Sequence, residues 1–286
     1  MHAHTFSGDS LFSGCALIVA ACLFGLRRLS PIGLMVARFA GLMGIGLVMV
    51  SATPLPLVFY AVWAAAVWTA LFVLRRTDGS ADRRLRRMTA IVVLLTALAA
   101  GWELRYRFPR AMFDRAATLY VIGEGSSMIV HPPDSPVWTR LLAQRHGVRV
   151  VDLSVRGATL AMGLEQAARL PDGPATVLLD IGGVDLMYMP AVLFAADLEA
   201  LLRAAARPER QIAMFELPLP AFHNQFGDVQ RRLCERFDVL LIPKHSVARA
   251  HPLSIWRIDA VNFTPKYQER MAALVMRWLG TAVARD

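Results

Sequence analysis

The chain has 286 residues, of which 56% are hydrophobic, with a mean hydropathy of +0.44 and a formal net charge of +9. A soluble domain of this size would be less apolar, so the composition indicates a membrane part joined to one globular domain. The basic excess is almost entirely arginine and much of it lies between apolar segments, which argues against a nucleic-acid-binding face. Cys15, Cys22 and Cys234 form neither a disulfide framework nor a metal-ligand spacing, and we expect no metal and no cofactor.

Four apolar segments occupy the N-terminal third of the chain. They are Leu11–Leu26, Ile32–Ser51, Pro54–Leu74 and Met88–Leu104. Crossing the hydrocarbon of a bilayer takes about 20 residues, within a range of about 17–25. The second and third segments fit that range, whereas the first and fourth need interfacial flanks or a thinner bilayer. We predict an α-helical membrane anchor of about four spans over residues 1–105, followed by a juxtamembrane linker at 106–117.

Arginine is distributed unevenly around these segments. The loops after the first and third segments carry Arg27, Arg28, Arg75, Arg76, Arg83, Arg84, Arg86 and Arg87. The turn Ser51–Pro56 and the N-terminal tail carry no Lys or Arg. Positively charged loops stay in the cytoplasm, so both termini are expected to face outward. This predicts an integral protein of the inner or plasma membrane with an extracytoplasmic (periplasmic) C-terminal domain.

The second segment contains a row of small residues at Gly33, Ala37 and Gly41. A small-xxx-small row lets two helix backbones approach closely. We expect this row to pack against a neighbouring helix, either of this chain or of a membrane-protein partner.

From Thr118 onward, short β-rich apolar runs alternate with helical segments. The expected strands are Thr118–Gly123, Val148–Ser154, Thr176–Gly182, Gln211–Leu217 and Val239–Pro243. The expected helices are Ser135–Gln144, Ala158–Leu170, Pro190–Ala206, Val229–Arg236 and Thr264–Trp278. Strands separated by helices imply βαβ units, so residues 118–286 are predicted to form a three-layer α/β/α, flavodoxin-like domain with a parallel sheet of about five strands.

Four short blocks of this domain carry polar or glycine residues where strands end. They are Gly123–Glu124–Gly125–Ser126–Ser127, Val151–Thr159 with Gly157, Gly182–Gly183–Val184–Asp185, and Asp259–Pro265 with Asn262. In order and spacing, Thr118–Leu279 resembles the SGNH/GDSL hydrolase family of serine esterases and lipases. The resemblance implies an SGNH-type fold and a pocket at the strand ends. It assigns to that pocket Gly123, Glu124, Gly125, Ser127, Gly157, Gly183, Val184, Asp185 and Asn262.

The resemblance also identifies which catalytic groups have changed. It places Gly125 at the nucleophile, Val184 at the asparagine that holds the oxyanion, and Asn262 at the histidine base. Losing a nucleophile or its base costs on the order of 10⁶ in turnover, and losing one oxyanion donor costs about 10²–10³. We therefore predict a catalytically impaired binding or scaffolding module for an envelope acyl or glycan ligand or for a membrane partner.

Two other hypotheses stay open. A shifted turn that presents Ser126 or Ser127, with His223 as the base and Asp259 behind it, would make an active esterase or deacetylase. His131, His245 and His251 are further candidates for that base. The third hypothesis is a transporter subunit. The letters Gly8–Asp9–Ser10–Leu11 spell the family's motif, but no strand precedes them, and we treat the match as chance.

Overall fold

The computed structural model describes residues 4–5, 7–26, 30–51, 53–73, 81–108, 118–124, 136–250 and 265–279. It divides into two compact units. The first is Met1–Arg107 with Leu219–Asn224, and the second is Phe108–Pro218 with Gln225–Asp286. Each unit is described by itself.

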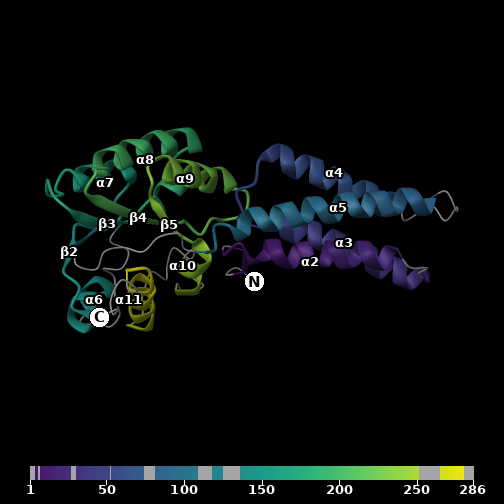
Figure 1. The fold of residues 1–286 in the computed structure, drawn as a ribbon, viewed down its shortest axis with the longest axis horizontal. Helices are drawn as coiled ribbons and strands as arrows, with labels where there is room; N and C mark the ends of the chain where they lie inside the picture. Colours follow the sequence, from purple (N-terminus) through teal and green to yellow (C-terminus); the bar gives the residue numbers. More distant parts are fainter. Residues whose placement is uncertain are drawn as a thin grey trace. The chain divides into compact units, whose positions relative to one another are not determined.

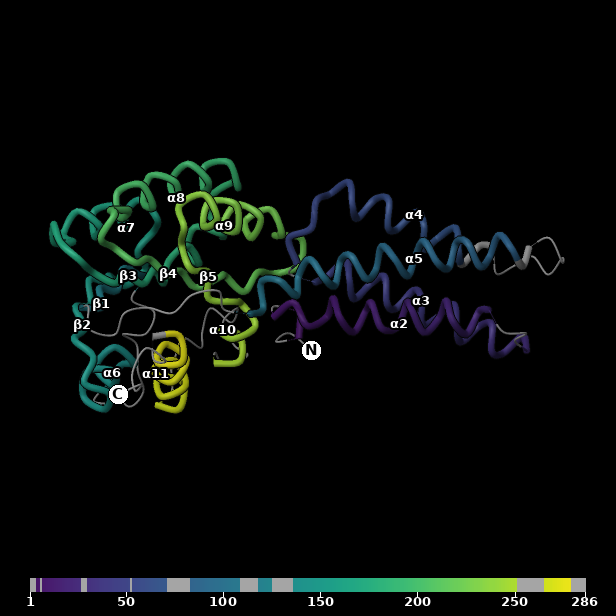
Figure 2. Tube along the Cα trace, in the orientation of Figure 1, coloured from purple at the N-terminus to yellow at the C-terminus, as the bar shows by residue number. Residues whose placement is uncertain are grey.

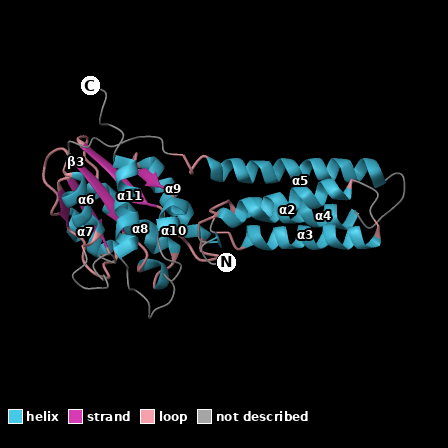
Figure 3. Cartoon of the chain, turned by 90° about the horizontal axis from the view of Figure 1, so that it is seen from below, coloured by secondary structure: helices cyan, strands magenta, loops and turns pink. Residues whose placement is uncertain are grey.

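The first unit is helical. Its long helices are α2 (Asp9–Gly25), α3 (Pro31–Met49), α4 (Leu57–Val73) and α5 (Ala81–Leu104), which run alongside one another (Figures 1 and 3). Each of the four apolar segments predicted from the sequence is therefore a helix. Among the described residues, Pro31–Met49 and Arg83–Leu104 are long and apolar enough to cross a membrane, so two candidate spans are found where about four were predicted. Asp9–Gly25 and Leu57–Ala70 are shorter apolar helices, and the fourth segment, not the third, reaches the required length because its helix extends into the arginines.

Helix α5 begins at Ala81 and not at Met88, where the apolar segment starts. The arginines that we expected in a loop lie on its first turns, and the side chains of Arg83, Arg84, Arg86 and Arg87 are exposed. Arginine is a good helix former, so the helix continues past the end of the apolar run. Asp9, within the letters that spell the family motif, is the first residue of α2, which agrees with a chance match.

Helices α2 and α3 pack through glycines. A Cβ placed on Gly14 would lie 2.7 Å from the carbonyl oxygen of Gly44, and one placed on Gly44 would lie 2.6 Å from a side-chain carbon of Ile18. Ala37 and Gly41 are buried on the same helix face as Gly44. Part of the small-residue row therefore continues into a contact inside this chain, where it brings two backbones together.

The second unit contains a five-stranded parallel sheet. Its strands are β1 (Leu119–Gly123), β2 (Val150–Asp152), β3 (Ala175–Asp180), β4 (Arg210–Phe215) and β5 (Leu240–Ile242), in the order β2-β1-β3-β4-β5 (Figure 2). Gly123 pairs in register with Asp180, so β1 and β3 end side by side. All five predicted strands are present, and each is shorter than the predicted run because pairing stops where the backbone turns away.

Helices cover both faces of this sheet. Helices α7 (Leu160–Ala167), α8 (Ala191–Ala205) and α9 (Asn224–Arg236) lie on one face, and α6 (Trp138–His146) and α11 (Pro265–Leu279) lie on the other (Figure 1). This is the predicted three-layer arrangement. A short helix, α10 (Lys244–Ala250), and a 3₁₀ turn, η2 (Asp185–Met187), were not expected, because both are too short to show an apolar period.

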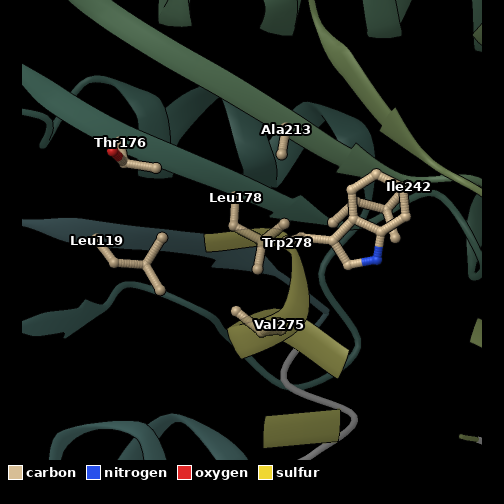
Figure 4. A pocket seen from close by; sticks show the side chains of 7 residues that line it. All are labelled: Leu119, Thr176, Leu178, Ala213, Ile242, Val275 and Trp278. Carbon is tan, nitrogen blue, oxygen red and sulfur yellow. The ribbon is translucent and has the colours of Figure 1, made fainter. Parts of the chain in front are cut away.

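A small void lies between the sheet and α11. Its lining is apolar apart from one threonine and comprises Leu119, Thr176, Leu178, Ala213, Ile242, Val275 and Trp278 (Figure 4). Its volume is about 10 Å³, which is at the lower limit for a single water molecule. We regard it as a packing defect and not as a ligand site.

The glycine contact between α2 and α3 predicts different outcomes for two substitutions on one helix. Gly44→Ala forces a methyl group against α2 and should lower the stability of the purified full-length protein by about 1–3 kcal/mol. Gly46→Ala is the matched control, because a Cβ on Gly46 would meet nothing within 4 Å and alanine is the better helix former. Thermal unfolding in detergent measures both. Equal midpoints for the two variants would contradict the close packing.

Candidate functional site

The candidate site lies at the C-terminal ends of β1, β2 and β3, where ligands bind in open parallel sheets. The N–H of Glu124, directly after β1, donates to the carbonyl of Asp180 at the end of β3, at 2.9 Å. The N–H of Gly157, in the turn after β2, donates to the carbonyl of Glu124 at 2.7 Å. The structure thus brings three of the four sequence blocks to one edge of the sheet.

The carboxylate of Glu124 connects β1 to the loop after β3. Its Oε1 accepts the N–H of Gly183 in a short hydrogen bond and the N–H of Val184 at 3.3 Å. A Cβ on Gly183 would lie 2.9 Å from that same oxygen, so a larger residue there would displace the Glu124 carboxylate. The side chain of Glu124 is therefore bonded to backbone N–H groups of the neighbouring loop.

Burial and nearby carboxylates raise the pKa of Glu124. Loss of hydration is the largest cause and the charge of Asp180 adds to it, while the two backbone N–H groups oppose them, and the pKa reaches about 8. Burial, followed by the charge of Asp152, raises the pKa of Asp180 to about 6. Burial, followed by the charges of Asp180 and Glu124, holds the pKa of Tyr267, on α11, well above its usual value. This edge of the sheet therefore buries two acidic groups, Glu124 and Asp180, close together.

Asp185 serves the fold. Its side chain is fully buried, and both carboxylate oxygens accept the N–H of Leu160, at 3.2 and 3.1 Å. Leu160 is the first residue of α7, so the carboxylate satisfies a backbone donor that the helix cannot. Burial raises the pKa of Asp185, opposed by this bond.

Gly157 adopts a backbone conformation that favours glycine, with φ of +72°. The family resemblance gives its N–H to the oxyanion, yet here that N–H is bonded to Glu124. Val184 occupies the position of the oxyanion asparagine with an apolar side chain, and its own N–H is bonded to Glu124 as well.

His223, the candidate base, lies in the loop between β4 and α9. Its Nδ1 is 3.0 Å from the carbonyl oxygen of Ala221. This loop, Leu219–Asn224, groups with the helical unit and not with the sheet. His245 lies on α10, with its Nε2 3.3 Å from the hydroxyl of Ser246.

Several predicted site residues fall outside the described part of the chain. They are Gly125, Ser126, Ser127, His131, His251, Asp259 and Asn262. In the active-esterase hypothesis, the nucleophile (Ser126 or Ser127) and the acid behind the base (Asp259) therefore stay predictions. Within the described residues, no group of three or more His, Cys, Asp and Glu side chains is arranged to hold a metal ion.

Two buried polar residues near this edge, Gln166 and Glu216, were not predicted from the sequence. Gln166, on the buried face of α7, donates to the carbonyl of Gly123 and accepts its N–H, at 3.2 and 2.9 Å. Beyond β4, Glu216 is buried with Arg231 at 2.7 Å and Lys244 at 3.7 Å, whose charges lower the pKa of Glu216 although burial opposes them. A polar residue on an apolar helix face or strand end is the pattern that would have indicated both.

We compared the chain with known proteins. No family model and no curated protein matches it. The crystal structure of TesA matches it with a TM-score of 0.50 and 22% identity over 58% of this chain and 99% of TesA. The crystal structure of AlinE4, an SGNH-hydrolase family esterase, matches over 61% of this chain and 100% of its own, with 20% identity and a TM-score of 0.42.

The second unit has a three-layer α/β/α fold that is similar to that of TesA. This agrees with the SGNH-type fold that the sequence resemblance implies. At this level of identity the likeness concerns the fold alone, so the chemistry of the site has to be argued from its own residues.

The raised pKa of Glu124 predicts a pH dependence of stability. Between about pH 4.5 and 8 the folded protein binds more protons at this carboxyl than the unfolded chain does, so the free energy of unfolding falls as pH rises. Glu124→Gln keeps an oxygen for the two N–H groups and removes the titration. Between pH 6 and 8, above the pKa of Asp180, we expect the variant to lose less stability than the wild type. Urea unfolding at each pH measures the free energy of unfolding. The same slope against pH for the wild type and the variant would contradict the raised pKa of Glu124.

Proposed function

We propose that this protein is a membrane-anchored, extracytoplasmic SGNH-fold protein that binds an acyl or glycan ligand of the cell envelope, or a membrane-protein partner, without hydrolysing esters. The observation that carries the proposal is the use of the N–H groups at the sheet edge. Those of Gly157, Gly183 and Val184 all donate to Glu124, to either its carbonyl or its carboxylate. An ester substrate would need such donors for the charge that develops on its carbonyl oxygen.

Other polar side chains of the described edge support the same proposal. Asp185 caps α7, and Gln166 is bonded to the backbone of Gly123. The carboxylate of Asp152 accepts from the hydroxyl of Thr139 at 2.9 Å and from the N–H of Ser154 at 3.0 Å. These groups stabilise the edge, and none of them pairs a nucleophile with a base. An ordered strand edge in which these side chains hold the backbone is the basis for proposing binding and not hydrolysis.

The membrane part of the proposal rests on the first unit. Helices α3 and α5 include segments long and apolar enough to span a bilayer, and α2 and α4 are shorter apolar helices beside them. Large apolar side chains cover the outside of α3, with Ile32, Met35 and Phe39 between 64% and 72% exposed. A soluble bundle would bury such residues, whereas lipid accommodates them.

Ester hydrolysis is the measurement that decides between the proposal and its alternative. Purified full-length protein with p-nitrophenyl acetate should show a rate that Ser126→Ala, Ser127→Ala and His223→Ala leave unchanged. The physical reason is that attack needs an activated hydroxyl and an unoccupied oxyanion site together. Turnover that Ser126→Ala or Ser127→Ala abolishes would establish an active esterase and overturn the proposal.

Membrane topology follows from the arginines near the start of α5. A cysteine introduced at Asp172, in the SGNH-fold domain, should react with a membrane-impermeant maleimide in intact cells from which any outer barrier has been removed. A cysteine at Ser80, beside the arginines, should react only after lysis. Cys15, Cys22 and Cys234 are buried and provide a low background. The opposite labelling pattern would place the domain in the cytoplasm.

A further inference from the structure

An apolar surface adjoins the candidate site. The stretch Leu186–Ala196, directly after Asp185, contains no charged residue. Four of its large side chains point away from the core, and we call them the apolar lip. Their exposed fractions are 54% for Met187, 79% for Tyr188, 79% for Val192 and 55% for Leu193. Soluble surfaces rarely present so many neighbouring large apolar groups without a binding role.

The apolar lip is held in place. The N–H of Met187 donates to the carbonyl of Val184 at 3.2 Å, and that of Tyr188 donates to the carbonyl of Asp185 at 3.1 Å. Between the exposed positions, Leu186 and Phe194 are buried, and the ring of Phe194 meets that of Phe226 edge to face at 5.2 Å. The exposure of the lip is therefore a property of the folded chain, fixed by the same loop that binds Glu124.

The chain itself supplies a partner of matching chemistry. At most about 50 Å of chain separates Leu104, at the end of α5, from Leu119, at the start of β1. If α5 is in the bilayer, the domain stays within reach of the lipid surface at a high effective concentration. Methionine, valine and leucine suit the acyl boundary, and the ring and hydroxyl of tyrosine suit the interface of a membrane.

We propose that the apolar lip docks into the interface between headgroups and acyl chains of the bilayer that anchors this protein. The C-terminal edge of the sheet, with Val184 and Gly183 next to the lip, then faces the membrane, so the ligand of the site comes from the lipid phase. This inference rests on the membrane anchoring proposed above. It assigns to the described part of the domain a membrane-facing edge and, at the opposite ends of the strands, an edge that faces water.

The test measures contact with lipid at three positions of the full-length protein in nanodiscs. Cysteines replace Val192 in the lip, Phe39 on the outside of α3, and Asp172 in the loop before β3, and each carries the same fluorophore. Phospholipids with a nitroxide on the acyl chain quench only fluorophores that reach the bilayer. We expect the labels at Val192 and Phe39 to lose most of their fluorescence and the label at Asp172 to keep it.

A charge in the lip provides the matched comparison. In the Val192→Cys protein, Tyr188→Glu should restore most of the fluorescence, because a carboxylate resists transfer into the interface. Gly173→Glu adds the same carboxylate at the opposite edge, in the loop before β3, where an added Cβ meets nothing within 4 Å, and should leave the quenching unchanged. Equal unfolding midpoints show that both variants are folded.

The outcomes separate the two proposals. Quenching at Phe39 without quenching at Val192 leaves the anchor intact and overturns the docking. Absence of quenching at both positions overturns the anchoring and the docking together. The fluorescence of the label at position 192 could instead depend on the number of protein copies per nanodisc and not on the nitroxide lipid. That result would show that a second copy covers the lip, and it would overturn the docking.

Discussion

The attachment of the Glu124 carboxylate to the backbone of Gly183 and Val184 is the constraint on which the site depends. It joins the end of β1 to the loop after β3, two segments that are far apart in the chain. It requires that a carboxyl group be buried beside Asp180, and this burial raises the pKa of Glu124 to about 8. These bonds hold the loop after β3 against the end of β1.

The same constraint supports the proposal that the edge binds a ligand without acyl transfer. Preorganised N–H donors stabilise a transition state only where they point at the atom that gains charge. Here the N–H groups of Gly157, Gly183 and Val184 are directed at Glu124. A fold that supports esterases elsewhere can in this way retain its strand ends, its turns and its helix caps while the donors serve the protein itself.

The sequence was sufficient to predict the helices, the strands and the three-layer arrangement, because each of these elements is recognised from residues that are close together in the chain. Each strand is a short apolar run bounded by Gly, Asp or Pro, and each long helix has an apolar period. The start of α5 was misplaced because hydropathy ends at Met88 whereas helix propensity continues through the arginines to Ala81. The bonds of Glu124, Gln166 and Glu216 were not deducible, since each depends on groups that only the folded sheet brings together.

The most direct test of the central claim is the mass of the intact full-length protein after treatment with a fluorophosphonate. This reagent phosphonylates a serine only where a base activates the hydroxyl and donors hold the oxyanion. The account predicts an unchanged mass for the folded protein under conditions that fully modify a working serine hydrolase. A stoichiometric adduct on Ser126 or Ser127 would contradict it.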